Sequence, residues 1–242
     1  MARIVILICL WGEYSLHIIA RIQTDFPTKF GVPRQSGLIN DLQGRIVFEG
    51  PYKNPDAVRG LEGFSHIWLI WQFSGAQRDG WSATVRPPRL GGNRRVGVFA
   101  TRSPFRPNPI GLSSVKLERI EYDEALGPVL HVRGADLVNG TPIFDIKPYL
   151  PFTDSHPEAA SGFAEPVRRD ALTVIFPDEL LERVPEPLRE QLIAVLEQDP
   201  RPHYQDDPTR RYGVPFGGQD IRFTVEDDVL TVCEVDIYEG ES

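Results

Sequence analysis

Cysteine and long hydrophobic runs are scarce in this 242-residue sequence. Its two cysteines, Cys9 and Cys233, fit neither a disulfide framework nor a metal site with paired ligands. A reducing compartment is their natural setting, so we expect a cytoplasmic protein. The apolar run Ile4–Trp11 has eight residues, whereas a helix needs about 20 to cross a bilayer. Because no small-x-small cleavage site follows, we interpret this run as a buried strand or an accessory extension and expect no membrane segment.

Several familiar enzyme motifs are also missing. The sequence has no G-x-G-x-x-G fingerprint, no G-x-x-x-x-G-K-[ST] phosphate loop, no H-E-x-x-H motif and no G-x-S-x-G elbow. The five histidines are His17, His66, His131, His156 and His203. They are scattered without ligand spacing, so we expect structural roles for them and no bound metal.

Acidic residues are absent from one long stretch of an otherwise acidic chain. Residues 80–117 contain six arginines, one lysine and no Asp or Glu, a net charge of +7. The whole chain carries −8, so the remainder carries −15. Arginine pairs well with phosphate and carboxylate, and a local positive field attracts a polyanion even to an acidic protein. The stretch predicts a phosphate-bearing partner; the alternative is a solvated loop whose arginines pair with acids from elsewhere in the fold.

The middle of this acid-free stretch is conformationally restricted. The segment GVFATRSPFRPNPIGLSSV, residues 97–115, has Arg102 and Arg106 as its only charges and contains three prolines. Proline restricts the backbone before a ligand arrives, which lowers the entropy cost of presenting the two guanidinium groups. This favours ligand binding over the solvated loop.

The N-terminal part of the chain predicts a mainly β fold. Short runs rich in Val, Ile, Phe and Trp lie between Gly, Pro and Asn residues, as strands do. The predicted strands are 17–24, 45–48, 64–73, 96–101, 113–122 and 129–132. Their spacing indicates a compact barrel in which the nearly apolar run 64–73 is a central strand covered on both faces. Only residues 56–62 look helical.

A smaller unit follows a break in the pattern. Pro, Ser, Ala and Gly dominate residues 151–166, which we interpret as a linker. Leu188, Leu192, Val195 and Leu196 then lie at helical spacing before Asp199-Pro200 ends the helix. Alternating apolar residues predict a closing hairpin over 221–225 and 229–237. The expected organisation is an N-terminal extension (1–14), a β-barrel domain (15–155), a linker (156–170) and a small α+β domain (171–242).

Four loops combine a restricted backbone with hydrogen-bonding side chains. They are GVPRQSG (31–37), the segment 102–112, NGTP (139–142) and DPRPHY (199–204). Gly and Pro make tight turns, while Arg, Gln, Asn and Thr offer donors and acceptors to a polar small molecule. Taken alone, NGTP is the sequence of a hairpin turn.

Five segments together carry a specific resemblance. They are VPRQSGL, PYKNPDAVRGLEGFSHIWLI, VRPPRLGGNRRVGVFATRSPFRPNPIGLS, DLVNGTPIFDIKPYLPF and DPRPHY. The chain resembles the TsaA-like, or TrmO, family of bacterial tRNA threonylcarbamoyladenosine methyltransferases from about residue 18 to residue 238. The resemblance implies a homodimer that uses S-adenosylmethionine on a β-barrel and methylates N6 of threonylcarbamoyladenosine beside the tRNA anticodon.

The resemblance also implies site residues. The implied cofactor-binding residues are Pro33, Arg34, Gln35, Ser74, Gly75, Arg102, Leu112, Asn139, Gly140, Thr141 and Pro142. Arg106 and Arg201 are the expected substrate-binding residues, with Arg201 directed to the threonylcarbamoyl carboxylate. Because the acceptor nitrogen starts with a proton, Asp199 and Tyr204 are candidate catalytic bases.

Two positions depart from the family pattern. Asn139 stands where the family usually has Asp, and Ser74 where His is common. Asparagine keeps the turn but loses a charge, so we expect weaker contacts to cofactor hydroxyls. Two other functions stay open: a non-catalytic module that binds S-adenosylmethionine or RNA, and a methyltransferase with another substrate. The DPRPHY loop favours the tRNA enzyme, because a sensor would not need a second substrate-facing loop.

Overall fold

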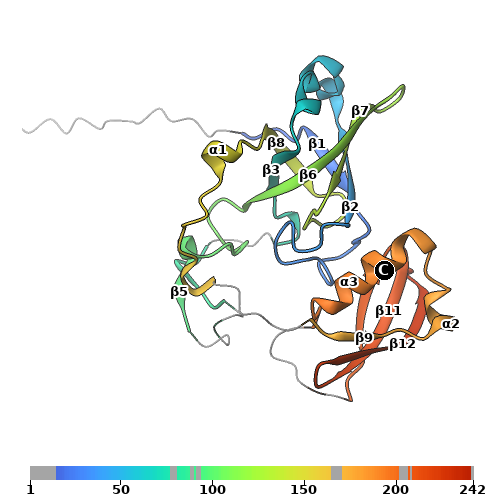
Figure 1. Ribbon diagram of the computed structural model, residues 1–242. Helices are drawn as coiled ribbons and strands as arrows, with labels where there is room; N and C mark the ends of the chain where they lie inside the picture. Colours follow the sequence, from blue (N-terminus) through green and yellow to red (C-terminus); the bar gives the residue numbers. More distant parts are fainter. Residues whose placement is uncertain are drawn as a thin grey trace, which may run out of the picture.

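A β-barrel and a smaller C-terminal sheet make up most of the computed structural model (Figure 1). The structure describes residues 15–76, 81–87, 90, 94–164, 171–201, 207 and 209–240. The extension 1–14, with the run Ile4–Trp11, lies outside the described residues, so its interpretation stays a prediction. Across the described part of the chain, no helix is both long and apolar enough to pass through a bilayer.

Six antiparallel strands close the barrel in the order β1-β2-β7-β6-β3-β8, which confirms the predicted mainly β architecture. The strands are β1 (Ala20–Gln23), β2 (Gln43–Phe48), β3 (His66–Gln72), β6 (Ile110–Asp123), β7 (Gly127–Arg133) and β8 (Pro142–Pro148). β8 was not predicted, and it closes the barrel by pairing with both β1 and β3.

Strand β3 shows how the sequence pattern becomes the barrel wall. Ile67, Leu69 and Trp71 are buried, whereas Trp68 and Ile70 between them are only half-buried. Side chains alternate across a strand, so the first set fills the barrel and the second lies outside it. The expectation that β3 is fully covered on both faces is therefore wrong for its outer face.

Two local predictions fail because the chain turns. The strand expected over 96–101 ends at β5 (Val96–Gly97), which pairs with β4 (Thr84–Val85). A 3-10 turn follows, because the backbone amide and the hydroxyl of Thr101 both donate to the Val98 carbonyl, at 3.1 and 2.8 Å. The helix expected over 56–62 is split into two 3-10 turns at Gly60, whose φ of +87° favours glycine.

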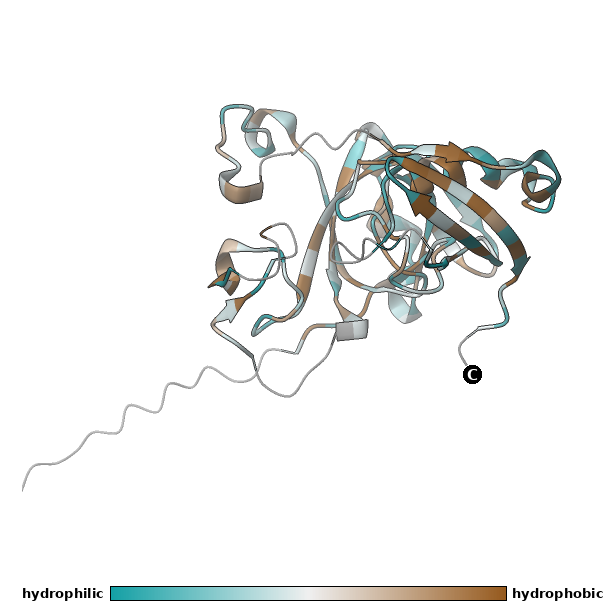
Figure 2. Cartoon of the chain, turned by 90° about the horizontal axis from the view of Figure 1, so that it is seen from below, coloured by the Kyte–Doolittle hydropathy of each residue, from teal (hydrophilic) through white to brown (hydrophobic). Residues whose placement is uncertain are grey.

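The C-terminal unit contains a four-stranded sheet and helix α3 (Glu186–Glu197). The sheet order is β10 (Tyr212–Phe216), β11 (Gln219–Glu226), β12 (Val229–Ile237) and β9 (Thr173–Ile175), with β9 parallel to β12. The predicted helix and hairpin agree with α3 and with the β11–β12 pair. Apolar and polar residues alternate along the hairpin strands (Figure 2).

The predicted linker is partly structured. It begins with the short helix α1 (Pro151–Asp154), and a 3-10 turn forms at Gly162–Ala164. A second short helix, α2 (Asp178–Leu181), precedes α3. The Leu150 backbone amide, just before α1, donates a hydrogen bond to the Asp154 carboxylate at the end of the helix, at 2.9 Å. This bond joins the two ends of the short helix.

The loop between β1 and β2 belongs to the core of the C-terminal unit. Phe26, Ile39 and Leu42 from this loop are buried among C-terminal residues. Phe26 packs edge-on against Phe216, with ring centroids 5.2 Å apart. The Gly217 amide donates to the Asp25 carbonyl at 2.9 Å, and burial raises the pKa of the Asp25 carboxyl. The loop that contains GVPRQSG is thus held by the C-terminal unit.

Candidate functional site

A cleft of about 640 Å³ lies at one end of the barrel. Its lining comes from the β1–β2 loop, strand β3, the start of β6 and the segment after β7. The part of the acid-free stretch before β6, residues 98–109, also contributes and is called the acid-free loop below. The lining residues are Pro33, Arg34, Gln35, Trp68, Trp71, Phe73, Phe99, Arg102, Arg106, Pro107, Asn108, Ile110, Gly111, Leu112 and Asp136. Aromatic walls with a few polar groups are typical of small-molecule sites.

Trp71 forms an aromatic wall of the cleft because glycine stands opposite it. Trp71 pairs across the sheet with Gly111. A Cβ atom on Gly111 would lie 2.3 Å from Cε2 of the indole, so only glycine lets the ring lie across β6. The ring also packs edge-on against Phe73, at 4.3 Å between centroids.

A buried hydrogen-bond chain runs from this wall to the one acidic lining residue. Trp71 Nε1 donates to Ser113 Oγ at 2.9 Å, and Ser113 Oγ donates to Asp136 Oδ1 at 2.6 Å. Burial raises the pKa of Asp136 from its ordinary value. The Ser113 hydrogen bond, the backbone amides of Asp136 and Ser36, and the charge of Arg102 oppose that rise. The result is a carboxyl group with a raised pKa and a fixed orientation.

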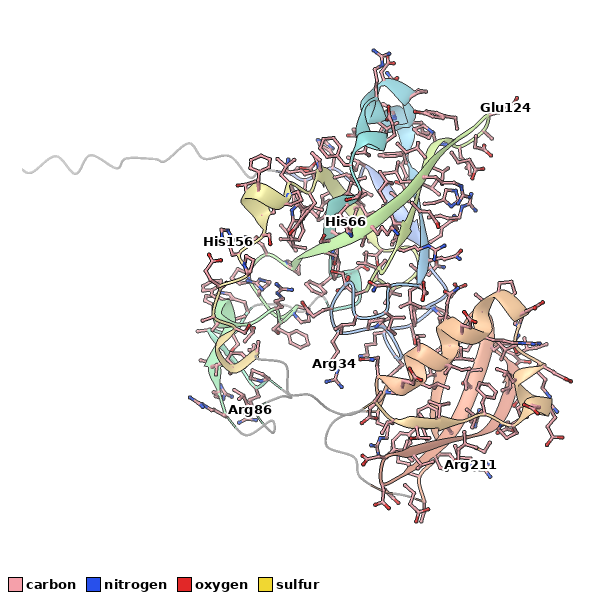
Figure 3. The ribbon with its side chains drawn as sticks, viewed as in Figure 1. Arg34, His66, Arg86, Glu124, His156 and Arg211 are labelled. Carbon is pink, nitrogen blue, oxygen red and sulfur yellow. The ribbon has the colours of Figure 1, made fainter. Side chains whose placement is uncertain are left out.

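The acid-free loop meets the β1–β2 loop in the cleft. Arg102 Nη1 donates a hydrogen bond to Gln35 Oε1, although the two residues are 67 positions apart. Arg106 Nη1 donates to the Thr101 carbonyl at 3.2 Å, which holds this guanidinium against its own loop. Arg34, which also lines the cleft, projects outward from the β1–β2 loop (Figure 3). Three guanidinium groups therefore line one cleft.

Trp68, on the outer face of β3, is anchored from helix α1. Its Nε1 donates to Asp154 Oδ2 at 2.8 Å, and the Leu150 amide donates to the same oxygen. These two hydrogen bonds, the Leu150 amide first, lower the pKa of Asp154. The hydrogen bond to Asp154 fixes the orientation of the Trp68 indole, which lines the cleft.

The structure brings six of the predicted site residues together. These are Pro33, Arg34, Gln35, Arg102, Arg106 and Leu112. Ser74 and Gly75 do not line the cleft; they lie in the 3-10 turn Ser74–Ala76, directly after the lining residue Phe73.

The predicted residues 139–142 contain a turn at Asn139 and Gly140 and lead into β8 at Pro142, and they do not line the cleft. Asn139 Oδ1 accepts the Thr24 amide at 3.2 Å, and Thr141 Oγ1 donates to the Val138 carbonyl at 2.6 Å. Arg21 Nη1 donates to the Gly140 carbonyl at 2.9 Å. These contacts join the turn to β1, and its part in cofactor binding stays a prediction.

The DPRPHY segment begins just after α3. Arg201 holds Asp199 in a bidentate ion pair, with Nε to Oδ1 at 2.8 Å and Nη2 to Oδ2 at 3.1 Å. Neither residue lines the cleft. Tyr204 lies outside the described residues. The proposed roles of these three residues stay predictions.

Sequence reasoning missed Trp68, Trp71, Ser113 and Asp136. The tryptophans were interpreted only as strand residues, and Ser113 only as the start of a strand. The available signal was a polar Ser113 at an inward position of β6, where an apolar residue is expected. No comparable pattern marks Asp136. Within the described ranges, no three His, Cys, Asp or Glu residues are grouped as a metal site would require.

Comparison with known proteins gives consistent matches along the chain. Residues 21–155 match the family model described as the tRNA-methyltransferase O N-terminal domain, and residues 170–237 match the TrmO C-terminal domain. The Escherichia coli protein named tRNA (adenine(37)-N6)-methyltransferase is 43% identical over 224 residues, covering 89% of this chain and 95% of the relative.

Two further comparisons extend these matches. A more distant relative from Pyrococcus abyssi, named a probable S-adenosyl-L-methionine-binding protein, is 36% identical over 144 residues, covering 60% of this chain and 72% of the relative. The crystal structure of TrmO from Pseudomonas aeruginosa superposes with a TM-score of 0.72 at 33% identity, covering 92% of this chain and 98% of that one.

Proposed function

This chain belongs to the tRNA-methyltransferase O family, and on that premise we propose that it transfers a methyl group from S-adenosylmethionine to N6 of threonylcarbamoyladenosine beside the tRNA anticodon. The observation that supports this most directly is the cleft in which the acid-free loop and the GVPRQSG loop meet through Arg102 and Gln35. It combines the features that a nucleoside cofactor and an RNA substrate both require.

The residues of the cleft fit S-adenosylmethionine. The cleft volume of about 640 Å³ lies within the usual range for small-molecule sites. Trp68, Trp71 and Phe73 offer faces to a purine ring, and Gln35 and Asn108 offer hydrogen bonds to hydroxyl groups. A guanidinium of the same cleft suits the cofactor carboxylate. When bound there, the cofactor supplies an electrophilic methyl group on a sulfonium.

The cationic rim fits tRNA. Arg34, Arg102 and Arg106 line the cleft, and further cations of the acid-free stretch precede Arg102 and follow Arg106 in the sequence. A positive field of this kind attracts phosphates whatever the net charge of the protein. Prolines restrict the loop backbone, and side-chain hydroxyl groups hold it by hydrogen bonds. For example, the Ser103 amide donates to Thr101 Oγ1 at 3.2 Å. Arg102 and Arg106 are therefore presented with little ordering cost.

Other predicted residues complete the proposal. Ser74, Gly75 and the turn at 139–142 contribute to the cofactor side, next to Phe73 and β1 respectively. Arg201 recognises the threonylcarbamoyl carboxylate by exchanging its present partner Asp199 for the substrate. The protein works in the cytoplasm as a homodimer.

Methyl incorporation into two tRNAs tests the proposal. One tRNA carries threonylcarbamoyladenosine, the other is the same transcript with plain adenosine, and both are incubated with labelled S-adenosylmethionine. We expect label only in the modified tRNA, and mass spectrometry of nucleosides to place it on N6. Equal labelling of both would contradict the substrate assignment. Cofactor binding by calorimetry without any methyl transfer would favour the non-catalytic module.

A further inference from the structure

Trp71, Ser113 and Asp136 form a hydrogen-bonded chain that ends at the wall of the cleft. Ser113 is only 1% exposed, yet its hydroxyl contacts two side chains. An indole N–H can only donate, so it takes a lone pair of the Ser113 oxygen. The Ser113 hydrogen must then point to Asp136 Oδ1, because a carboxylate accepts. The chain therefore has one direction, from the indole to the carboxylate.

The Ser113 hydroxyl engages Oδ1 of this carboxylate, at 2.6 Å. The backbone amides of Asp136 and Ser36 also stabilise its charge, so the group is held in one orientation. Asp136 also lines the cleft, so the carboxyl group meets both the barrel interior and the ligand space. A carboxylate held in a fixed orientation at the wall of a cleft can act on a group that is bound there.

Asp136 is the one carboxyl group among the described lining residues of the cleft. The other charged lining residues are Arg34, Arg102 and Arg106, and a guanidinium group donates hydrogen bonds but does not accept a proton. Burial raises the pKa of Asp136, which makes its carboxylate a stronger base than an exposed one. Asp199 is less suited, because Arg201 binds both of its oxygens and it does not line the cleft.

The proposed reaction requires a proton acceptor. N6 of threonylcarbamoyladenosine carries one hydrogen, which must leave when the nitrogen gains a methyl group. We propose that Asp136, held by Ser113 and Trp71, accepts this proton. The nitrogen electron pair forms the new N–C bond, the S–C bond breaks with its pair on sulfur, and the N–H proton passes to the Asp136 carboxylate and then to water.

Asp136→Asn is the first test of this inference, which rests on the proposed function. Asparagine keeps the shape and can still accept from Ser113, but it cannot take the proton. We expect single-turnover methyl transfer to modified tRNA to fall by about 100-fold or more. The affinities for S-adenosylmethionine and tRNA, measured by calorimetry, should stay within about threefold. The melting temperature at neutral pH should not fall, because a desolvated charge has been removed.

Two outcomes would overturn the inference. One is a single-turnover rate within about threefold of wild type. The other is a large loss of S-adenosylmethionine affinity with a normal rate at saturation, which would make Asp136 a counter-ion of the cofactor. A wild-type protein that fails to label modified tRNA would instead refute the proposed function itself.

Ser113→Ala supplies a readout that does not depend on the Asp136 variant. The Ser113 hydroxyl stabilises the charged carboxylate, so its removal raises the pKa of Asp136 further. The acidic limb of the pH profile of single-turnover methyl transfer should move to higher pH. Ser114→Ala is the matched control, since Ser114 is the next residue on β6 and faces away from the barrel interior. If Ser113→Ala lowers the rate at every pH but leaves the acidic limb of the pH profile at its wild-type position, the inference is overturned.

Discussion

Replacing Gly111 with alanine should displace the aromatic wall of the cleft. The new Cβ would lie 2.3, 2.4 and 2.6 Å from three carbon atoms of the Trp71 indole, well inside van der Waals contact. Trp71 is 8% exposed and already contacts Ser113 and Phe73, so the ring has little room to move. Forcing one extra methyl into a packed core costs about 1–3 kcal/mol.

This cost sets the expected size of the effect. For a domain of this length, 1 kcal/mol corresponds to a change in melting temperature of about 2–4 °C. Gly111→Ala should therefore melt roughly 2–12 °C below wild type, followed by circular dichroism. Because the indole must leave its position, calorimetry should also show weaker binding of S-adenosylmethionine.

Gly63→Ala is the matched control for this prediction. Gly63 is exposed, and no heavy atom lies within 4 Å of its added Cβ. We expect its free energy of unfolding to change by no more than about 0.5 kcal/mol. A double variant with Trp71→Leu tests the cause, because the alanine should cost much less once the indole is gone. If Gly111→Ala keeps the wild-type melting temperature and cofactor affinity, the assignment of Trp71 as a cleft wall is wrong.

Three further predictions follow from the same geometry. Arg102→Ala should reduce kcat/KM by about 10- to 150-fold, since a charge-assisted hydrogen bond contributes about 1.5–3 kcal/mol. Its melting temperature should stay close to that of the exposed control Arg59→Ala. A large fall in melting temperature with full activity in the folded fraction would make Arg102 a structural residue. Methyl transfer to tRNA should fall steeply between about 50 and 200 mM salt, because each neutralised phosphate releases counterions, and a flat salt profile would argue against phosphate contacts in residues 80–117. Gly31→Ala should destabilise the C-terminal unit, because Gly31 has φ +82° and its added Cβ would lie 2.6 Å from Val214 Cγ1. Gly37→Ala is the control, because Gly37 has φ +76° but no heavy atom within 4 Å of its added Cβ, so it carries the backbone strain alone. Equal melting temperatures for the two variants would refute the packing argument.

Much of the architecture could be read from the sequence because it depends on local patterns. The apolar run 64–73 predicts a strand of the barrel, which is β3, and helical spacing predicts α3. The sequence predicts ligand binding in the acid-free stretch and in the GVPRQSG loop, and six of the predicted residues line one cleft. Each of these features is encoded within a few neighbouring residues.

What only the tertiary structure decided are the contacts between distant segments. The hydrogen bond from Arg102 to Gln35 joins residues 67 positions apart, and Phe26 enters the core of a unit that starts more than a hundred residues later. Asp136 follows β7, and it is linked to Trp71 through Ser113 because the sheet order places β7, β6 and β3 side by side. Strand order and register are set by the packing of the whole barrel, so no local pattern could show that these three side chains form one hydrogen-bonded chain.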